Sequence, residues 1–168
     1  GFTGDVGEGF ADQALDSTSL ELVWNALAEQ ALWLLIGTIP LATEASALSL
    51  QAAVKQAAAS GVRLALDVNW RPTFWDAAAD PAAGPKPEDL ARMRPLLEQA
   101  ALIKLAREEA EWLFSSSDPA LISAGLPQKP DVLVTDGGEP VRWCMAGHDG
   151  SMPVLAPPQV VDTTGAGD

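Results

Sequence analysis

Short apolar runs alternate with longer segments of helical periodicity along most of the chain. A short apolar run closed by glycine or polar residues is typical of a strand buried on both faces. Such strands are expected at residues 32–36, 62–68, 101–105 and 131–135. The pattern therefore predicts a central sheet with four buried strands.

The segments between these strands carry helix signals. Helices are expected at residues 18–31, 43–60, 87–100, 107–114 and 118–125. Thr18 opens a capping box, and Asp118 with Pro119 forms an N-cap and N1 pair. Pro95 is expected to kink the third helix, and the Pro-rich residues 72–87 are expected to form a surface excursion.

Two further apolar segments near the end of the chain predict an antiparallel hairpin. They are residues 141–145 and 152–156, separated by residues 147–150. Strands that alternate with helices predict βαβ units, and hence an α/β fold with a doubly wound, mostly parallel sheet covered by helices. Ligands bind such sheets beyond the carboxyl ends of the strands. This rule brings four segments to one edge, namely 37–40, 67–71, 104–109 and 135–138.

The composition narrows the classes of function. The 168 residues include 10 Lys and Arg against 23 Asp and Glu, and the resulting formal charge of −13 disfavours binding to nucleic acid. One cysteine, Cys144, and one histidine, His148, exclude an internal disulfide and a metal cluster built on thiolates or several histidines. The longest apolar stretch, 31–42, is too short to span a membrane. The unpaired cysteine favours a cytoplasmic location.

The strongest chemical signal is Val-Val-Asp-Thr-Thr-Gly-Ala-Gly-Asp at residues 160–168. Gly165 and Gly167 allow a tight turn around Ala166 with its N–H groups pointing one way, and a following helix would add further donors. Such an anion hole suits a phosphoryl group in transit, and Asp168 beside it would be the general base for an attacking hydroxyl. The alternative is a plain turn, because a lone Gly-x-Gly occurs in many loops.

Five segments, in order along the chain, resemble motifs of the ribokinase-like (PfkB) carbohydrate kinases. They are Gly37-Thr38-Ile39-Pro40-Leu41-Ala42, Asp67-Val68-Asn69-Trp70-Arg71-Pro72 with Trp75, Lys104 through Glu109, Val134-Thr135-Asp136-Gly137-Gly138, and Asp162-Thr163-Thr164-Gly165-Ala166-Gly167-Asp168. The Asn-Trp-Arg-Pro segment followed by Trp75 is most similar to fructokinases. The resemblance implies that residues 1–168 form part of a ribokinase-like kinase domain, from its nucleotide-binding region up to the anion hole. The family's N-terminal part and its C-terminal end are not matched.

The resemblance also implies cofactors and a role for each matched position. Asp168 would be the catalytic base, and Gly165, Ala166 and Gly167 would form the anion hole. The strand end with Thr135, Gly137 and Gly138 would bind the nucleotide. Glu109 would lie at the water shell of magnesium, and Asp162 and Thr164 would lie at a monovalent cation. The implied small molecules are a sugar, ATP and Mg²⁺, with K⁺ in many members. Relatives often dimerise through a lid, so the resemblance allows a homodimer of the complete protein.

Two positions depart from the family pattern. Ala106 stands where an Asn-x-x-Glu element has its Asn, so a polar contact is lost close to Glu109. Pro140 stands where the nucleotide loop usually has a second glycine, which makes this loop stiffer.

The strand-end residues also have simpler structural explanations. Asn69 and Arg71, with Asp67, are expected to line the sugar and phosphate cleft, but a solvated strand end with an Asp–Arg pair would also explain them. Lys104 either reaches a nucleotide phosphate or points to solvent at the end of its strand. Glu109 belongs either to the metal site or to the acidic first turn of a helix.

Two hypotheses of different classes follow. The first is a magnesium-requiring sugar kinase, an alcohol-group phosphotransferase that acts on fructose, with 2-keto-3-deoxygluconate or a nucleoside as alternative acceptors. The second is that the chain as it stands is a non-catalytic fragment or a weak nucleotide-binding module, because an incomplete sheet has an unpaired edge and uncovered apolar faces. A dinucleotide-binding domain is discounted, because Gly37 is followed by Thr-Ile-Pro-Leu instead of a Gly-x-Gly-x-x-Gly turn.

Overall fold

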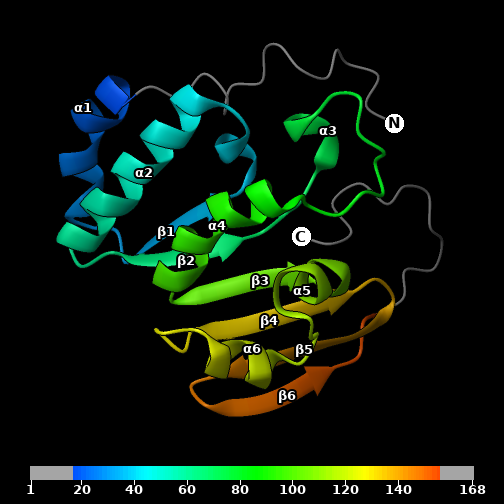
Figure 1. Cartoon of the computed structure of the whole chain (residues 1–168). Helices are drawn as coiled ribbons and strands as arrows, with labels where there is room; N and C mark the ends of the chain where they lie inside the picture. The colour runs from blue at the N-terminus through cyan, green and yellow to red at the C-terminus, as the bar shows by residue number, and fades with distance from the viewer. Residues whose placement is uncertain (1–16, 156–168) are drawn as a thin grey trace.

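The protein folds around a six-stranded sheet. The computed structural model describes residues 17–155. The strands are β1 (Trp33–Gly37), β2 (Arg63–Asp67), β3 (Leu102–Ala106), β4 (Asp131–Asp136), β5 (Glu139–Met145) and β6 (His148–Met152). They lie in chain order across the sheet, with β1 to β4 parallel and β5 and β6 antiparallel (Figure 1). The α/β class, the four parallel strands and the C-terminal hairpin are confirmed.

The helices connect the parallel strands and follow the sequence prediction closely. They are α1 (Ser17–Ala28), the 3₁₀ turn η2 (Ile39–Ala42), α2 (Glu44–Ala59), α3 (Pro72–Trp75), α4 (Pro87–Gln99), α5 (Arg107–Phe114) and α6 (Pro119–Gly125). The Asp118 cap is confirmed, because its carboxylate accepts the N–H groups of Ala120 and Leu121 at 2.9 and 3.4 Å. Thr18 lies inside α1 instead of capping it. Residues 16–19 all carry capping side chains, so the sequence does not decide where the helix begins.

The hairpin differs in register from the prediction. Ala146 and Gly147 both have positive φ, 50° and 77°, and form a two-residue turn whose twist matches the strands on either side. β6 therefore begins at His148, and the segment predicted as a loop is part of the strand. Gly150 is needed there because of Trp143, with which it pairs across the strands: a Cβ at Gly150 would lie 2.3 Å from the indole.

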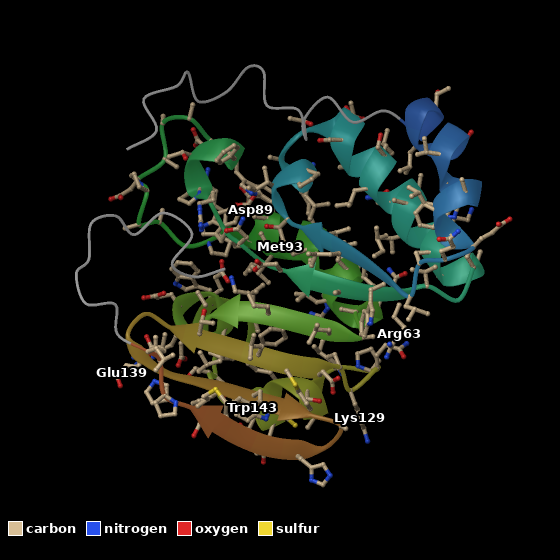
Figure 2. The ribbon with its side chains drawn as sticks, turned by 180° about the vertical axis from the view of Figure 1, so that it is seen from behind. Arg63, Asp89, Met93, Lys129, Glu139 and Trp143 are labelled. Atoms are coloured by element: carbon tan, nitrogen blue, oxygen red, sulfur yellow. The ribbon has the colours of Figure 1, made fainter. Side chains whose placement is uncertain are left out.

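The core lies on one face of the sheet. Side chains alternate between faces along a strand, and the core residues of the parallel strands share one face: Ile36, Leu64, Leu66, Ile103, Leu105, Val132 and Val134. The helices α2, α4, α5 and α6 pack on this face with residues that include Leu50, Met93, Leu96, Ala110 and Ile122. Figure 1 shows α4, α5 and α6 in front of the sheet, and Figure 2 shows the strands from behind. Within residues 17–155, helices thus cover one of the two faces.

The strand β1 forms an exposed edge. In the described part of the chain it pairs with β2 alone, and the nearby side chains of Leu32 and Leu35 are 73% and 71% exposed. Trp33 is partly exposed too, with the Arg63 guanidinium 3.9 Å from its ring centroid. No helix among residues 17–155 is both long and apolar enough to cross a membrane.

Candidate active site

The carboxyl ends of the parallel strands bring most of the predicted site residues to one edge. Gly37 is paired in register with Asp67, Asp67 with Lys104, and Ala106 with Thr135. Figure 1 shows the loops that follow β2, β3 and β4 on the same side of the sheet. The edge predicted from the strand pattern is therefore the one that the fold builds.

The first part of this edge is fixed by a threonine that the sequence analysis did not single out. Thr38 is fully buried immediately after β1, and its hydroxyl donates a 2.5 Å hydrogen bond to the carbonyl of Val68. The next residue, Asn69, has a φ of +43°, in the left-handed region that asparagine adopts more readily than most residues. The chain leaving β2 thus turns sharply at Asn69 beside the end of β1.

The loop after this turn is held by Trp70. Its indole Nε1 donates to the Ala83 carbonyl at 2.8 Å, and its ring centroid lies 5.2 Å from that of Trp75. Arg71 is exposed, and its guanidinium donates to the Trp70 carbonyl at 2.9 Å. The two tryptophans therefore serve as packing anchors for a loop that presents Asn69 and Arg71 at the strand edge.

Lys104 and Asp67 form an ion pair. Their side chains project from adjacent strands, 3.2 Å separates ammonium and carboxylate, and both groups are about one-fifth to one-quarter exposed. The Asp–Arg pair considered from the sequence is wrong, because the carboxylate of Asp67 pairs with Lys104 across the sheet and not with Arg71 along the chain. Register explains the difference: Lys104 lies directly beside Asp67 on the same face.

Glu109 is the most buried acidic group of the edge, at 5% exposure. Its Oε2 accepts the N–H of Ala106 at 2.8 Å, and its Oε1 accepts the N–H of Trp70 at 2.5 Å. Burial raises the pKa of this carboxyl, and the two backbone hydrogen bonds oppose the rise. The nearby charge of Asp67 raises the pKa further, while that of Lys104 lowers it. Glu109 is thus a helix-capping group that also reaches a second loop.

The turn between β4 and β5 carries the predicted nucleotide contacts. The hydroxyl of Thr135 donates to the Leu105 carbonyl at 3.4 Å, which ties the end of β4 to β3. Gly137 has a φ of +53°, and both Gly137 and Gly138 are exposed. Neither glycine would meet an atom within 4 Å if it carried a Cβ, so the surface above the turn is open.

A cavity of about 630 Å³ lies beside this turn. It is lined by Arg107, Ser117, Val134, Asp136, Glu139, Pro140, Arg142 and Ser151. Both of its arginines are paired within the protein: Arg107 lies 3.2 Å from Asp136, and Arg142 lies 3.5 Å from Asp118. Sequence reasoning gave neither arginine a role: Arg107 lies within the predicted edge segment 104–109 but was not singled out, and Arg142 lies inside β5, where the strand-end rule does not apply.

The predicted anion hole and cation ligands lie outside the described residues. They are Asp162, Thr164, Gly165, Ala166, Gly167 and Asp168. Among residues 17–155, no group of three or more His, Cys, Asp or Glu side chains could hold a metal ion. The described part of the edge therefore provides polar side chains and backbone groups for a ligand, without a metal centre of its own.

Comparison with known proteins relates the chain to a family of kinases. The model of the "pfkB family carbohydrate kinase" matches residues 8–168. A fructokinase from Salmonella thompson is 32% identical over 142 residues, which cover 81% of this chain and 59% of that protein. A probable fructokinase-5 from Arabidopsis thaliana is 29% identical over 135 residues, covering 79% of this chain and 39% of that protein. The chain thus spans between two-fifths and three-fifths of the length of these curated relatives.

Solved structures show the same fold. The PfkB protein from Polaromonas sp. JS666 superimposes with a TM-score of 0.70 at 19% identity, covering 89% of this chain and 48% of that one. A putative ribokinase II from E. coli, in complex with ATP and Mg²⁺, gives 0.67 at 22% identity, covering 93% and 46%. A fructokinase from Xylella fastidiosa with bound ATP gives 0.61 at 24% identity, covering 77% and 40%.

Proposed function

Because this chain belongs to the PfkB family of carbohydrate kinases, we propose that it is the nucleotide-binding part of an enzyme that transfers the γ-phosphoryl group of ATP to a sugar hydroxyl. Fructose is the preferred acceptor in this proposal, since fructokinases are among the relatives that share about a third of its residues. The observation that carries the proposal is the convergence of Asn69, just after β2, with Lys104 and Thr135, toward the carboxyl ends of β3 and β4, at one edge of the parallel sheet.

The described residues would position the two substrates. Asn69 and Arg71 would face the sugar and the transferred phosphoryl group, because their loop is anchored at the edge by Trp70. Thr135, Gly137 and Gly138 would receive the nucleotide phosphates, where an open turn lets phosphate oxygens approach the backbone. Lys104 would contribute positive charge only from within its pair with Asp67.

The chemical step is assigned to residues 162–168. Asp168 would accept the proton of the sugar hydroxyl while that oxygen attacks the γ-phosphorus and ADP leaves. The N–H groups of Gly165, Ala166 and Gly167 would stabilise the negative charge on the phosphoryl oxygens in transit. The match of residues 8–168 to the family supports both roles.

The carboxylates at this edge are placed to contact a metal ion through its bound water molecules and not by direct coordination. Asp67 is paired with Lys104, Asp136 with Arg107, and both oxygens of Glu109 accept backbone N–H groups. None of them is therefore poised as a direct ligand for Mg²⁺, which would neutralise phosphate charge when bound with ATP. In this proposal Asp162 and Thr164 hold K⁺, and the water shell of Mg²⁺ is one of two alternative roles for Glu109.

Replacing Asp168 with Asn in the full-length protein tests the mechanism. We expect kcat to fall by about 10²–10⁴-fold, because the general base is lost, while the KM for ATP stays within about threefold. Asp149→Asn in the exposed hairpin is the matched control and should retain the wild-type rate. An Asp168→Asn enzyme with the wild-type kcat would refute the general-base role.

A panel of acceptors tests the substrate. Fructose, 2-keto-3-deoxygluconate, ribose and adenosine are compared by kcat/KM with ATP as donor. We expect the highest value for fructose. A value at least tenfold higher for any other acceptor would reassign the substrate within the family.

One observation favours a different role for the 168 residues by themselves. Among residues 17–155, β1 pairs with β2 alone, and the side chains of Leu32 and Leu35 are exposed beside it, which is typical of a surface that needs a covering element. The isolated chain would then be a non-catalytic unit that binds nucleotide weakly at most. A coupled assay with ATP and fructose should detect no turnover by this chain, and substantial turnover would contradict this reading.

A further inference from the structure

One buried carboxylate joins two loops of the proposed active-site edge that are far apart in the sequence. Glu109 is 39 residues from Trp70, yet its Oε1 accepts the Trp70 N–H at 2.5 Å. Its other oxygen accepts the N–H of Ala106, the N-cap residue of its own helix, at 2.8 Å. The loop after β2 and the junction between β3 and α5 are thus tied to a single side chain.

The geometry requires both carboxylate oxygens of Glu109 to be hydrogen-bond acceptors. The residue is 5% exposed, so a backbone N–H left without a partner there would not be compensated by water. Glutamate provides two acceptor oxygens, whereas glutamine of the same shape provides one acceptor and one donor group. A glutamine at 109 could therefore satisfy either Ala106 or Trp70, but not both.

The loop that Glu109 holds is the one that presents Asn69 and Arg71. The left-handed conformation of Asn69, at a φ of +43°, precedes the peptide N–H that meets Glu109. Arg71 follows directly, and its guanidinium donates to the Trp70 carbonyl. Trp70 therefore has its backbone N–H, its carbonyl and its indole N–H all engaged.

We propose that Glu109 is a positioning residue that sets the place of the Asn69–Arg71 loop relative to the ends of β3 and β4. It acts through the Trp70 N–H and touches neither substrate. This inference rests on the proposed kinase function, since it assigns the sugar and phosphate contacts to Asn69 and Arg71. It differs from a role at the magnesium water shell, in which Glu109 would act through the metal and leave the Trp70 loop unaffected.

Amide hydrogen exchange of Trp70 tests the contact without reference to activity. In the wild-type chain we expect this amide to be protected, and in Glu109→Gln we expect its exchange to be at least about tenfold faster. Glu108→Gln and Glu111→Gln, on exposed positions of the same helix, are the matched controls and should leave Trp70 protected. An unprotected Trp70 amide in the wild type would overturn the inference, even if the Glu109→Gln protein did not fold.

Kinetics of the full-length protein test the positioning role. Glu109→Gln should lower kcat/KM for the sugar by about 10–100-fold, while the Mg²⁺ concentration for half-maximal rate stays within about twofold. Arg71→Ala should cost less in the Glu109→Gln background than in the wild type, because the loop that carries it is already displaced. A large rise in the Mg²⁺ requirement with an unchanged Trp70 amide would favour the metal role and overturn the positioning role.

The two readouts separate this inference from the proposed function. A protein that transfers no phosphoryl group to any sugar, with Trp70 still protected, would refute the proposed function together with the kinetic part of the inference. The contact between Glu109 and the Trp70 loop would stand in that case. An active kinase in which Glu109→Gln behaves like Glu108→Gln would refute the positioning role alone.

Discussion

Thr38 offers a sharp test of how the active-site edge is held together. Its side chain is fully buried, and its hydroxyl donates to the carbonyl of Val68, 30 residues away. Thr38→Val replaces the hydroxyl with a methyl group of almost the same size. The change therefore leaves the packing nearly intact and leaves the Val68 carbonyl without its donor.

The expected magnitude follows from that geometry. A buried carbonyl that loses its partner costs about 1–3 kcal/mol in the free energy of unfolding, because water does not replace the lost donor. For a domain of this length, each kcal/mol lowers the Tm by about 2–4 °C. Thr38→Val should therefore lower the Tm by about 2–12 °C.

Urea and thermal unfolding, followed by circular dichroism, measure this loss. Thr18→Val, at an exposed position of α1, is the matched control and should stay within about 0.5 kcal/mol of the wild type. If Thr38→Val unfolds at the same urea concentration as Thr18→Val, the hydroxyl does not stabilise the junction of β1 and β2. Thr38 would then not fix the end of β1 to the chain leaving β2.

Three further changes probe other parts of the molecule. Burial raises the pKa of Glu109 above its unfolded value near 4.5, so its contribution to the free energy of unfolding is full below that value and is lost as pH rises through the folded pKa. The free energy of unfolding of the wild type minus that of Glu109→Gln, measured by urea unfolding from pH 4 to 8, should therefore be largest at acid pH. Gly150→Ala places a Cβ 2.3 Å from Trp143 and should cost about 1–3 kcal/mol, whereas Gly125→Ala, with open space around it, should cost much less in the same thermal melts. Leu35→Lys, at a position 71% exposed, should change stability by less than about 0.5 kcal/mol and reduce self-association of the isolated chain in size-exclusion chromatography.

The sequence predicts best those features that depend on neighbouring residues. The helix α5 was expected at residues 107–114 and lies at Arg107–Phe114, because its apolar spacing and acidic first turn are local signals. Asp118 caps α6 as expected, since an Asp–Pro pair specifies a helix start without help from the rest of the chain. The strand edge was predictable for a similar reason, because parallel βαβ units fix where the carboxyl ends of the strands lie.

The features that were missed depend on partners distant in sequence. A pair between Asp67 and Arg71, four residues apart, was one explanation considered from the sequence, but the sheet register places Lys104 beside Asp67, 37 residues away. The start of the second hairpin strand was misplaced because glycine signals a turn, whereas Gly150 is required by the ring of Trp143 on the neighbouring strand. Spacing along the chain carries no information on such contacts until the register of the strands is known.

The cross-links at the edge are consistent with the loops being held in place for the proposed phosphoryl transfer. Thr38 ties the end of β1 to the chain leaving β2, Glu109 ties that chain to the start of α5, and Thr135 ties β4 to β3. Each link joins a side chain to a backbone group, and none of the three uses the side chain of Asn69 or Arg71. Catalysis of phosphoryl transfer depends mainly on holding groups in place before the substrates arrive. Side-chain-to-backbone links satisfy that requirement, because they fix the backbone of the loops while their side chains can vary with the substrate.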